Sequence, residues 1–169
     1  RLWAMVRNAI TQARSLQSAK CDEGSYPMAA SESPDRKTNR AVQIVEPRDM
    51  GPRDWGEEIL IAQGDGYIGK SLIMKAGTAG GLQYHERKEE TFLLVEGQAH
   101  VDTDNGNGGL KRIQMIPGMV IHVPKGAVHR VTAVTDCSFM EWSNDVFNDR
   151  VRCEKEYNQP EVGGLPSTK

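Results

Sequence analysis

The chain has 169 residues, of which 38% are hydrophobic and 26% are charged, and its formal net charge is −2. This length suits one domain with a sizeable core and a modest extension. The near-neutral balance gives no general attraction to nucleic acid or to a membrane surface. No apolar run approaches the roughly 20 residues that a membrane-spanning helix needs.

The basic charge is concentrated at the start of the chain. Residues 1–20 contain four basic residues and no acidic one, so the rest of the chain, with 17 basic and 23 acidic residues, has a net charge of −6. Hydrophobic residues recur at helical spacing from residue 2 to residue 18 and predict an N-terminal amphipathic helix. An arginine-rich leader without acidic residues is also typical of an organelle transit peptide, whereas a helix that docks on the domain or a partner gives the same pattern.

Residues 21–41 show no periodicity and contain Gly24, Pro27 and Pro34, so they are predicted to be a flexible linker. Cys21, Cys137 and Cys153 are odd in number, and no pair has the C-x-x-C spacing of a zinc site. They are interpreted as free thiols in a reducing compartment, which favours a cytoplasmic location, with an organelle as the alternative.

Residues 42–152 are predicted to form one all-β domain. Short apolar segments alternate with glycine turns such as Gly64-Asp65-Gly66 and Asn105-Gly106-Asn107-Gly108-Gly109, a pattern that indicates an antiparallel barrel or sandwich. Pro124 is expected at a strand end, because proline cannot donate to a strand ladder. The expected strands are 42–45, 58–62, 67–74, 98–104, 110–116, 119–123, 128–134 and 137–142, with a helical turn at 144–148 and an edge strand near Val151. Residues 153–169 are expected to be a polar tail on the surface.

Two stretches of this domain hold candidate metal ligands. Side chains alternate across a strand, so Gln83 and His85 share a face, and Glu90 joins them if the chain turns after Arg87. His129 comes from a distant stretch that follows a turn at Pro124. Two imidazoles and one carboxylate with open positions can hold Fe(II), Mn(II), Ni(II), Co(II) or Zn(II). Gln83 would add a neutral oxygen ligand.

These two stretches resemble the two motifs of the cupin superfamily. The first motif corresponds to Gly77, Gln83, His85, Glu90 and Gly97, and the second to Gly118, Pro124, Gly126 and His129. The first motif normally opens with a histidine where this chain has Gln83, and the second often closes with an asparagine where this chain has Ala133. The resemblance covers about residues 42–145 and implies a jelly-roll β-barrel.

The Gln-x-His variant is similar to the mannose-6-phosphate isomerase-like branch of the cupins. That resemblance implies that Gln83, His85, Glu90 and His129 hold a metal, typically zinc. It implies isomerisation or epimerisation of a sugar or sugar phosphate, in which a metal polarises a carbonyl and a base moves a proton between adjacent carbons.

The remaining candidate residues concern the substrate. Lys70, Arg87, Lys88 and Arg130 are basic groups that could hold a phosphate, and His122 is expected to line the barrel or to orient a ligand. Three residues remain open as the catalytic base, namely His122, Glu96 and Glu141. Trp55, Phe92 and Trp142 are expected in the core.

Other functions stay open at this point. The domain could bind a small molecule or carbohydrate without catalysis, act as an iron-dependent dioxygenase, or serve as an assembly subunit docked through its N-terminal helix. Without a histidine at position 83, dioxygenases that need three histidine ligands are disfavoured. A homodimer is expected, because open barrel edges tend to be covered.

Overall fold

The computed structural model describes residues 42–168, and the predicted N-terminal helix and the whole of the predicted linker lie outside these residues. All described residues except Val42 belong to one unit, Gln43–Lys169. No helix within residues 42–168 is long and apolar enough to cross a membrane.

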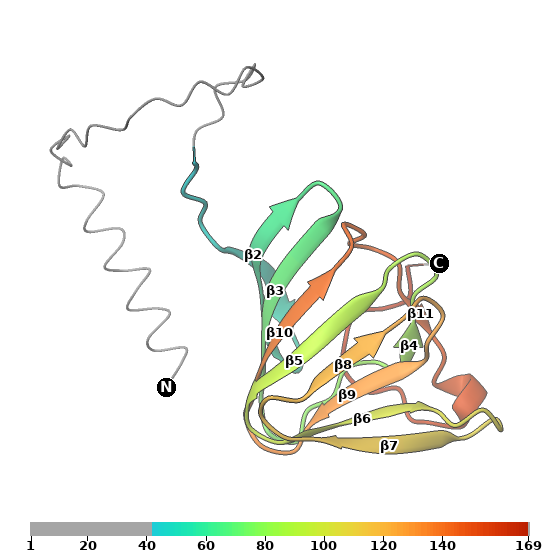
Figure 1. The fold of residues 1–169 in the computed structure, drawn as a ribbon. Coiled ribbons are helices and arrows are strands. Elements are labelled where there is room, and N and C mark those ends of the chain that lie inside the picture. The colour runs from blue at the N-terminus through green and yellow to red at the C-terminus, as the bar shows by residue number, and fades with distance from the viewer. Residues whose placement is uncertain (1–41, 169) are drawn as a thin grey trace, which may run out of the picture. The chain divides into compact units, whose positions relative to one another are not determined.

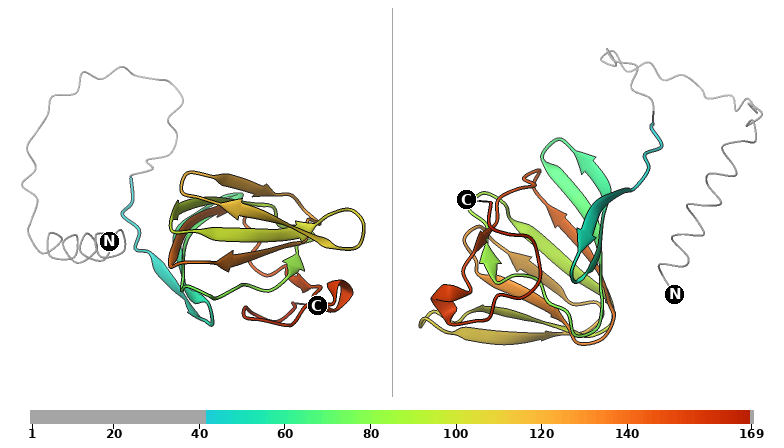
Figure 2. Two further views of the ribbon diagram at one scale, coloured as in Figure 1. Left: turned by 90° about the horizontal axis from the view of Figure 1, so that it is seen from below. Right: turned by 180° about the vertical axis from the view of Figure 1, so that it is seen from behind.

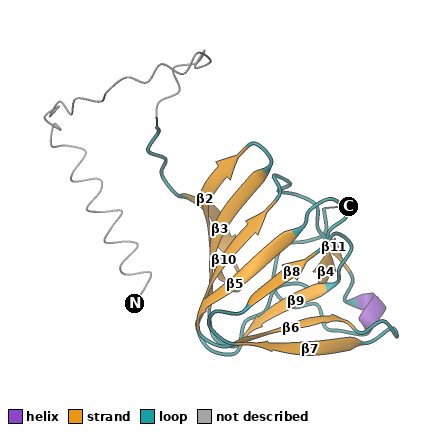
Figure 3. Cartoon of the chain, in the orientation of Figure 1, coloured by secondary structure: helices purple, strands orange, loops and turns teal. Residues whose placement is uncertain are grey.

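Two antiparallel sheets form the domain, as Figures 1 and 3 show. The six-stranded sheet has the order β1-β2-β3-β10-β5-β8 and the five-stranded sheet has the order β11-β4-β9-β6-β7. The strands of the first sheet are β1 (Arg48–Arg53), β2 (Gly56–Gly64), β3 (Tyr67–Met74), β10 (Cys137–Ser143), β5 (Glu90–Glu96) and β8 (Val120–Val123). Those of the second are β11 (Val151–Arg152), β4 (Gln83–Tyr84), β9 (His129–Ala133), β6 (Ala99–Asp104) and β7 (Leu110–Met115). The predicted all-β jelly-roll barrel is confirmed.

The alternation of side chains places the core between the sheets. In β5, Glu90, Phe92 and Leu94 are buried, while the residues between them are only partly buried. Phe92 and Leu94 pack with residues of both sheets, among them Val101, Met115 and Phe139. Full burial of each such side chain contributes roughly 1.5–3 kcal/mol. The polar Glu90 lies on the same inward face as this apolar row, so the core borders a polar site.

The glycine that closes the first motif is required by its surroundings. Gly97 lies between β5 and β6 with φ +94°, a conformation that residues with a side chain rarely adopt. A Cβ atom there would lie 2.2 Å from the carbonyl oxygen of Asp136. Gly97 therefore allows the chain to cross tightly from one sheet to the other.

Several expected elements are found near their predicted bounds. The two glycine turns connect the strands of the hairpins β2–β3 and β6–β7. The later apolar segments correspond to β8, β9 and β10. Pro124 directly follows β8, and Val151 lies in an edge strand that pairs with β4.

Other expectations were wrong. Residues 42–45 form no strand, and Val42 and Ile44 are exposed. The first strand is instead β1, which lacks alternation and is defined by its pairing with β2. β-Propensity depends on such pairing, so an apolar segment without a partner strand does not form one.

Residues 144–148 form a loop rather than a helical turn, because the Asn144 side chain donates a hydrogen bond to the carbonyl of Arg87 at 2.9 Å. Trp142 is 45% exposed and lies outside the core. It alternates with buried residues of β10 and therefore faces outward.

The C-terminal segment is more than a surface tail. Cys153 and Glu154 are buried, and the short 3₁₀ helix η1 (Lys155–Tyr157) follows them. The Arg152 guanidinium then donates hydrogen bonds of 2.9 Å to the carbonyls of Val162 and Gly163. These bonds fold the last residues back beside β11 and β4, as the right panel of Figure 2 shows.

Candidate metal centre

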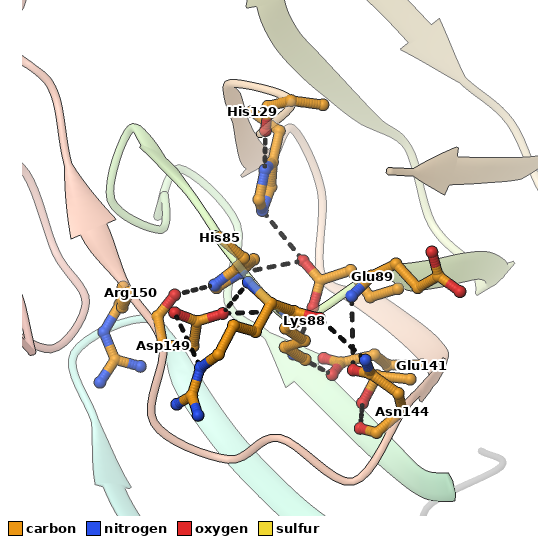
Figure 4. Close-up of polar contacts among 12 residues, drawn as sticks. His85, Lys88, Glu89, His129, Glu141, Asn144, Asp149 and Arg150 are labelled. Atoms are coloured by element: carbon orange, nitrogen blue, oxygen red, sulfur yellow. Dashed lines mark hydrogen bonds and ion pairs between the residues drawn. The ribbon is translucent and has the colours of Figure 1, made fainter. Parts of the chain in front are cut away.

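His85, Glu90 and His129 converge inside the barrel from three separate elements. His85 follows β4, Glu90 begins β5 and His129 begins β9. Each is at most 4% exposed. One Glu90 oxygen, Oε1, lies 3.0 Å from His129 Nε2 and 3.4 Å from His85 Nε2. Figure 4 shows a dashed line from each of the two imidazoles to one oxygen atom between them.

Backbone carbonyls fix the proton position in both imidazoles. His85 Nδ1 lies 2.6 Å from the carbonyl oxygen of Asp149, and His129 Nδ1 lies 3.0 Å from that of Ala127. A carbonyl oxygen can only accept, so each Nδ1 carries a hydrogen, and the neutral form of each imidazole then presents a lone pair at Nε2. His85 Nε2 is buried and has no hydrogen-bond partner among the described residues. Two lone pairs and a carboxylate oxygen therefore face one point, which is the arrangement of metal ligands.

The distances suit a divalent ion. Ligand atoms about 2.1 Å from one ion lie about 3.0 Å apart at a right angle and about 3.4 Å apart at a tetrahedral angle. The two measured separations match these values. All three ligand atoms lie within 4.8 Å of one another. The nitrogen and oxygen donors suit zinc, manganese, iron, nickel or cobalt.

The two motifs support each other through the backbone. The Gly126 N–H donates to the carbonyl of His85 at 2.7 Å, so the second motif holds the first. Gln83 pairs directly with His129 across β4 and β9. Paired residues project to the same side of a sheet, and Gln83 lines the same cavity as the three candidate ligands. Its role as a fourth ligand stays a prediction.

A row of alternating charges extends from the candidate ligands across the six-stranded sheet. Lys88 Nζ contacts the second oxygen of Glu90 and lies 2.7 Å from Glu141 Oε1. Lys70 Nζ lies 3.5 Å from the same Glu141 oxygen and 2.7 Å from Glu58 Oε1. The guanidinium of Arg53 closes the row with a 2.7 Å bond to the other Glu58 oxygen.

Burial and pairing set the ionisation of this row. Burial lowers the pKa of Lys88, but Glu141 and Glu90 raise it more strongly, so Lys88 keeps its proton. Burial raises the pKa of Glu90, but the Lys88 ammonium holds it well below its usual value. Glu90 is therefore an ionised carboxylate with one oxygen bound to Lys88 and the other free to serve as a ligand.

The candidate ligands and the charged row line one cavity of about 480 Å³. This volume lies within the usual range of small-molecule sites. Trp55, Leu72 and Phe92 supply apolar wall, and Gly164 and Leu165 of the C-terminal segment form part of another side. The carbonyl of Trp55 accepts hydrogen bonds from Lys75 N–H and from the Thr78 hydroxyl. These bonds hold the turn that contains Trp55 in place.

The structure brings together only some of the predicted substrate residues. Lys70 and Lys88 line the cavity, whereas Arg87, His122 and Arg130 do not. The Arg87 side chain is 70% exposed. His122 is exposed and lies 3.1 Å from the Thr91 hydroxyl. Arg130 is the neighbour of the inward His129, so alternation directs it to the opposite face, where it donates to the Pro160 carbonyl.

The same geometry separates the three candidate bases. Glu141 lines the cavity, whereas Glu96 and His122 are exposed and lie outside its lining. Arg87, His122 and Arg130 lie outside the lining of this cavity, and their roles in substrate binding stay predictions.

Four charged residues near the cavity were missed by the sequence reasoning. Arg53, Glu58 and Arg150 line it, and Asp149 anchors the loop beside it. The buried Asp149 carboxylate accepts the backbone N–H groups of Arg87 and Lys88, while its carbonyl holds His85. No local spacing marks these residues. The one usable signal lies in the neighbouring strands, where Lys70 shares a buried face with Ile68, Leu72 and Met74 and Glu141 shares one with Phe139.

Comparison with known proteins relates this domain to one family. Residues 70–143 match the family described as Cupin domain. The barrel has the cupin fold. Its matched residues contain the candidate ligands and the central part of the charged row. No curated protein matches the chain.

Solved structures share the cupin fold at low identity. The capsular polysaccharide assembling protein CapF from Staphylococcus aureus is 22% identical with a TM-score of 0.55, over 64% of this chain and 32% of CapF. KdgF from Halomonas sp. is 16% identical with a TM-score of 0.52, over 61% and 90% of the two chains. Bacillus subtilis oxalate decarboxylase, in a structure concerned with its Mn(II) centres, is 16% identical with a TM-score of 0.54, over 63% and 30%. The matched part of this chain spans about a third of the CapF chain, and these likenesses establish the fold alone.

Proposed function

We propose that this cupin is a metal-dependent enzyme that isomerises or epimerises a sugar or sugar phosphate. The observation that carries the proposal is the convergence of two imidazole nitrogens and a carboxylate oxygen on a cavity that also holds the Lys88–Glu141 pair. A metal bound there would act as a Lewis acid toward a carbonyl or hydroxyl oxygen.

The residues around the ligands provide for proton transfer. Glu141 is the one cavity-lining member of the three candidate bases. We assign it the removal of the proton from the carbon next to the carbonyl and its return to the former carbonyl carbon. The hydroxyl proton passes to the former carbonyl oxygen at the same time, so the rearrangement involves no net oxidation. Lys88 and Lys70 hold this carboxylate between them, and Lys88 also orients Glu90. Because Lys88 keeps its proton, it serves as a hydrogen-bond donor rather than as a base.

Fold relatives support the proposal in two respects. CapF is a capsular polysaccharide assembling protein, which favours a carbohydrate ligand for this domain. The oxalate decarboxylase contains Mn(II) centres, which favours a metal in the barrel. We propose zinc as the resident metal, with manganese, iron, nickel and cobalt as alternatives, and we propose that Gln83 completes the ligand set.

A substrate panel tests this function. The protein is loaded separately with each of these five metals and incubated with aldoses and ketoses, with and without a phosphate, while interconversion is followed by chromatography. We expect turnover of one member of the panel, loss of turnover in Glu141→Gln, and full metal content in that variant. No turnover by a fully metallated protein on the whole panel would refute the activity.

One observation favours a second candidate. Two histidines and one carboxylate are also the ligand set of non-haem Fe(II) oxygenases. Oxygen consumption by the Fe(II)-loaded protein, absent from the zinc-loaded protein, would support that function. A protein that binds a sugar saturably and yields no product with any metal would instead be a binding module.

A further inference from the structure

Arg150 is a cavity residue whose hydrogen-bonding capacity is largely unused. It follows Asp149, the residue whose carbonyl holds His85, so its backbone adjoins the candidate metal centre. The partly buried guanidinium donates through Nε to the Pro166 carbonyl at 3.2 Å. Within residues 42–168, neither terminal nitrogen of this guanidinium has a hydrogen-bond partner, and Figure 4 shows the side chain beside Asp149.

The neighbouring charges make this arrangement costly without a ligand. Burial lowers the pKa of Arg150, Glu58 raises it, and the like charge of Arg53 lowers it further. Glu58 already accepts contacts of 2.7 Å from both Arg53 and Lys70. Its carboxylate is therefore shared among cations, and Arg150 has no ion-pair partner of its own in the described part of the chain.

The cavity as a whole carries an excess of positive charge. Its lining contains four cations, Arg53, Lys70, Lys88 and Arg150, and three carboxylates, Glu58, Glu90 and Glu141. Metal ligation requires both histidines to be neutral, so they add no charge to the lining. The lining thus has a net charge of +1, which a divalent ion would raise to +3. Such a cavity favours an anionic ligand over a neutral one.

We propose that Arg150, with Arg53 beside it, forms the subsite that holds the anionic group of the substrate, a phosphate or a carboxylate. The inference rests on the proposed function, because it assigns the sugar's carbonyl end to the metal centre and its anionic end to Arg150. A guanidinium presents two parallel N–H donors that match the oxygens of either anion.

The fold holds this subsite in place before a ligand arrives. The backbone N–H of Arg150 donates to the Thr168 hydroxyl at 2.8 Å, and its carbonyl accepts from Thr168 N–H at 2.9 Å. Together with the bond to Pro166, these contacts fix the arginine against the same C-terminal segment that supplies Gly164 and Leu165 to the cavity wall. Little side-chain freedom is then lost when an anion binds.

Calorimetric titration of the full chain tests the subsite without requiring turnover. Inorganic phosphate and acetate are titrated first, in chelator and after metal loading, followed by a hexose phosphate and a hexuronate. We expect Arg150→Gln to weaken binding of at least one anion class by about tenfold or more, with and without metal. Arg150→Lys should recover part of the loss, and preference for the hexose phosphate or the hexuronate distinguishes a phosphate from a carboxylate substrate.

Matched controls separate the subsite from general surface charge. Arg87→Gln removes an exposed arginine close to the same loop, and Arg112→Gln removes one that pairs with Asp102 on β6. Both should change anion affinity by less than about twofold. Unchanged affinity in a folded Arg150→Gln protein, or an equal loss in Arg87→Gln, would overturn the inference. Equal metal content in all variants shows that the barrel is intact.

Failure of this inference differs from failure of the proposed function. Anion binding that depends on Arg150, in a protein that converts no sugar, would refute the activity and leave the subsite intact. Turnover of a neutral sugar that is insensitive to Arg150→Gln would refute the subsite and leave the activity intact.

Discussion

The cavity has two halves that are built in different ways. The metal half, named for its candidate metal ligands, contains His85 and Glu90, which lie close together in sequence, and His129, which follows a glycine turn. The charged half draws Arg53, Glu58, Lys70 and Glu141 from four strands, β1, β2, β3 and β10. Both halves meet at Lys88, whose ammonium group contacts Glu90 on one side and Glu141 on the other.

This difference decides what each half depends on. The spacing of two short stretches fixes the metal half, and backbone carbonyls orient its imidazoles. The charged half depends on strand register, because Glu141 faces Lys70 directly across β10 and β3. The metal half should therefore respond mainly to local substitutions, and the charged half to loss of any one member of its row.

Removal of Lys88 should have the largest effect on stability, because the Lys88 ammonium connects Glu90 of the metal half with Glu141 of the charged half. In metal-free protein, Lys88→Met leaves the buried Glu90 and Glu141 carboxylates without their shared cation. Breaking a buried ion pair in this way costs about 3–5 kcal/mol of unfolding free energy, which urea denaturation measures. Lys155→Met, at a side chain that is 90% exposed, is the control and should leave the urea midpoint unchanged. Equal urea midpoints for the two variants would contradict the stabilising role of Lys88 between Glu90 and Glu141.

A smaller effect is expected at Asp149, which supports the metal half only. Asp149→Ala removes the carboxylate that accepts the N–H groups of Arg87 and Lys88, and so loosens the segment that carries the carbonyl partner of His85. Metal affinity should fall by about tenfold, as measured by competition with a chelating dye. Asp136→Ala removes a carboxylate that likewise accepts a backbone N–H, from Ala76, away from the cavity. A similar loss of affinity in that variant would argue against a specific role for Asp149.

The smallest effect concerns pH and the charged half. Burial raises the pKa of Glu58, but Lys70 and Arg53 lower it more strongly, so the folded-state pKa lies below the ordinary value. Glu58 therefore stabilises the fold above its unfolded-state pKa of about 4.3, and this contribution is lost as the pH falls through the lower folded-state pKa. Glu58→Gln should be less stable at pH 7 and should show a shallower loss of stability below about pH 4.3 in urea denaturation. A steeper loss of stability with falling pH in Glu58→Gln than in the parent protein would contradict this prediction.

The sequence indicated that His85, Glu90 and His129 lie close together, and the reason is physical. Alternation within β5 places Glu90 on the buried face with Phe92, and the glycine turns mark where each strand must end. These signals are local. The charged half cannot be predicted from such local signals, because Arg53 lies in a strand without alternation and Arg150 lies in a loop. Only the pairing of strands brings Glu58 and Glu141 to either side of Lys70.

The differences between expectation and structure have the same origin. Arg87 and Lys88 are adjacent in one charge run, yet Lys88 is buried among carboxylates and Arg87 is exposed. Adjacent residues project in different directions, and the sequence does not show which of the two turns inward. The C-terminal residues look like a polar tail, but the hydrogen bonds that Arg150 and Arg152 make with them become visible only in the folded chain. The homodimer, the compartment and the role of the N-terminal helix stay predictions.

The metal content of the purified protein tests the central claim most directly. After saturation with Zn²⁺ and exhaustive dialysis, elemental analysis should find about one ion per chain in the parent protein and in His122→Ala. His129→Ala and Glu90→Gln should each retain less than about a tenth of that amount. A parent protein without metal, or a His129→Ala protein that retains as much as the parent, would contradict the assignment of His85, Glu90 and His129 as a metal centre.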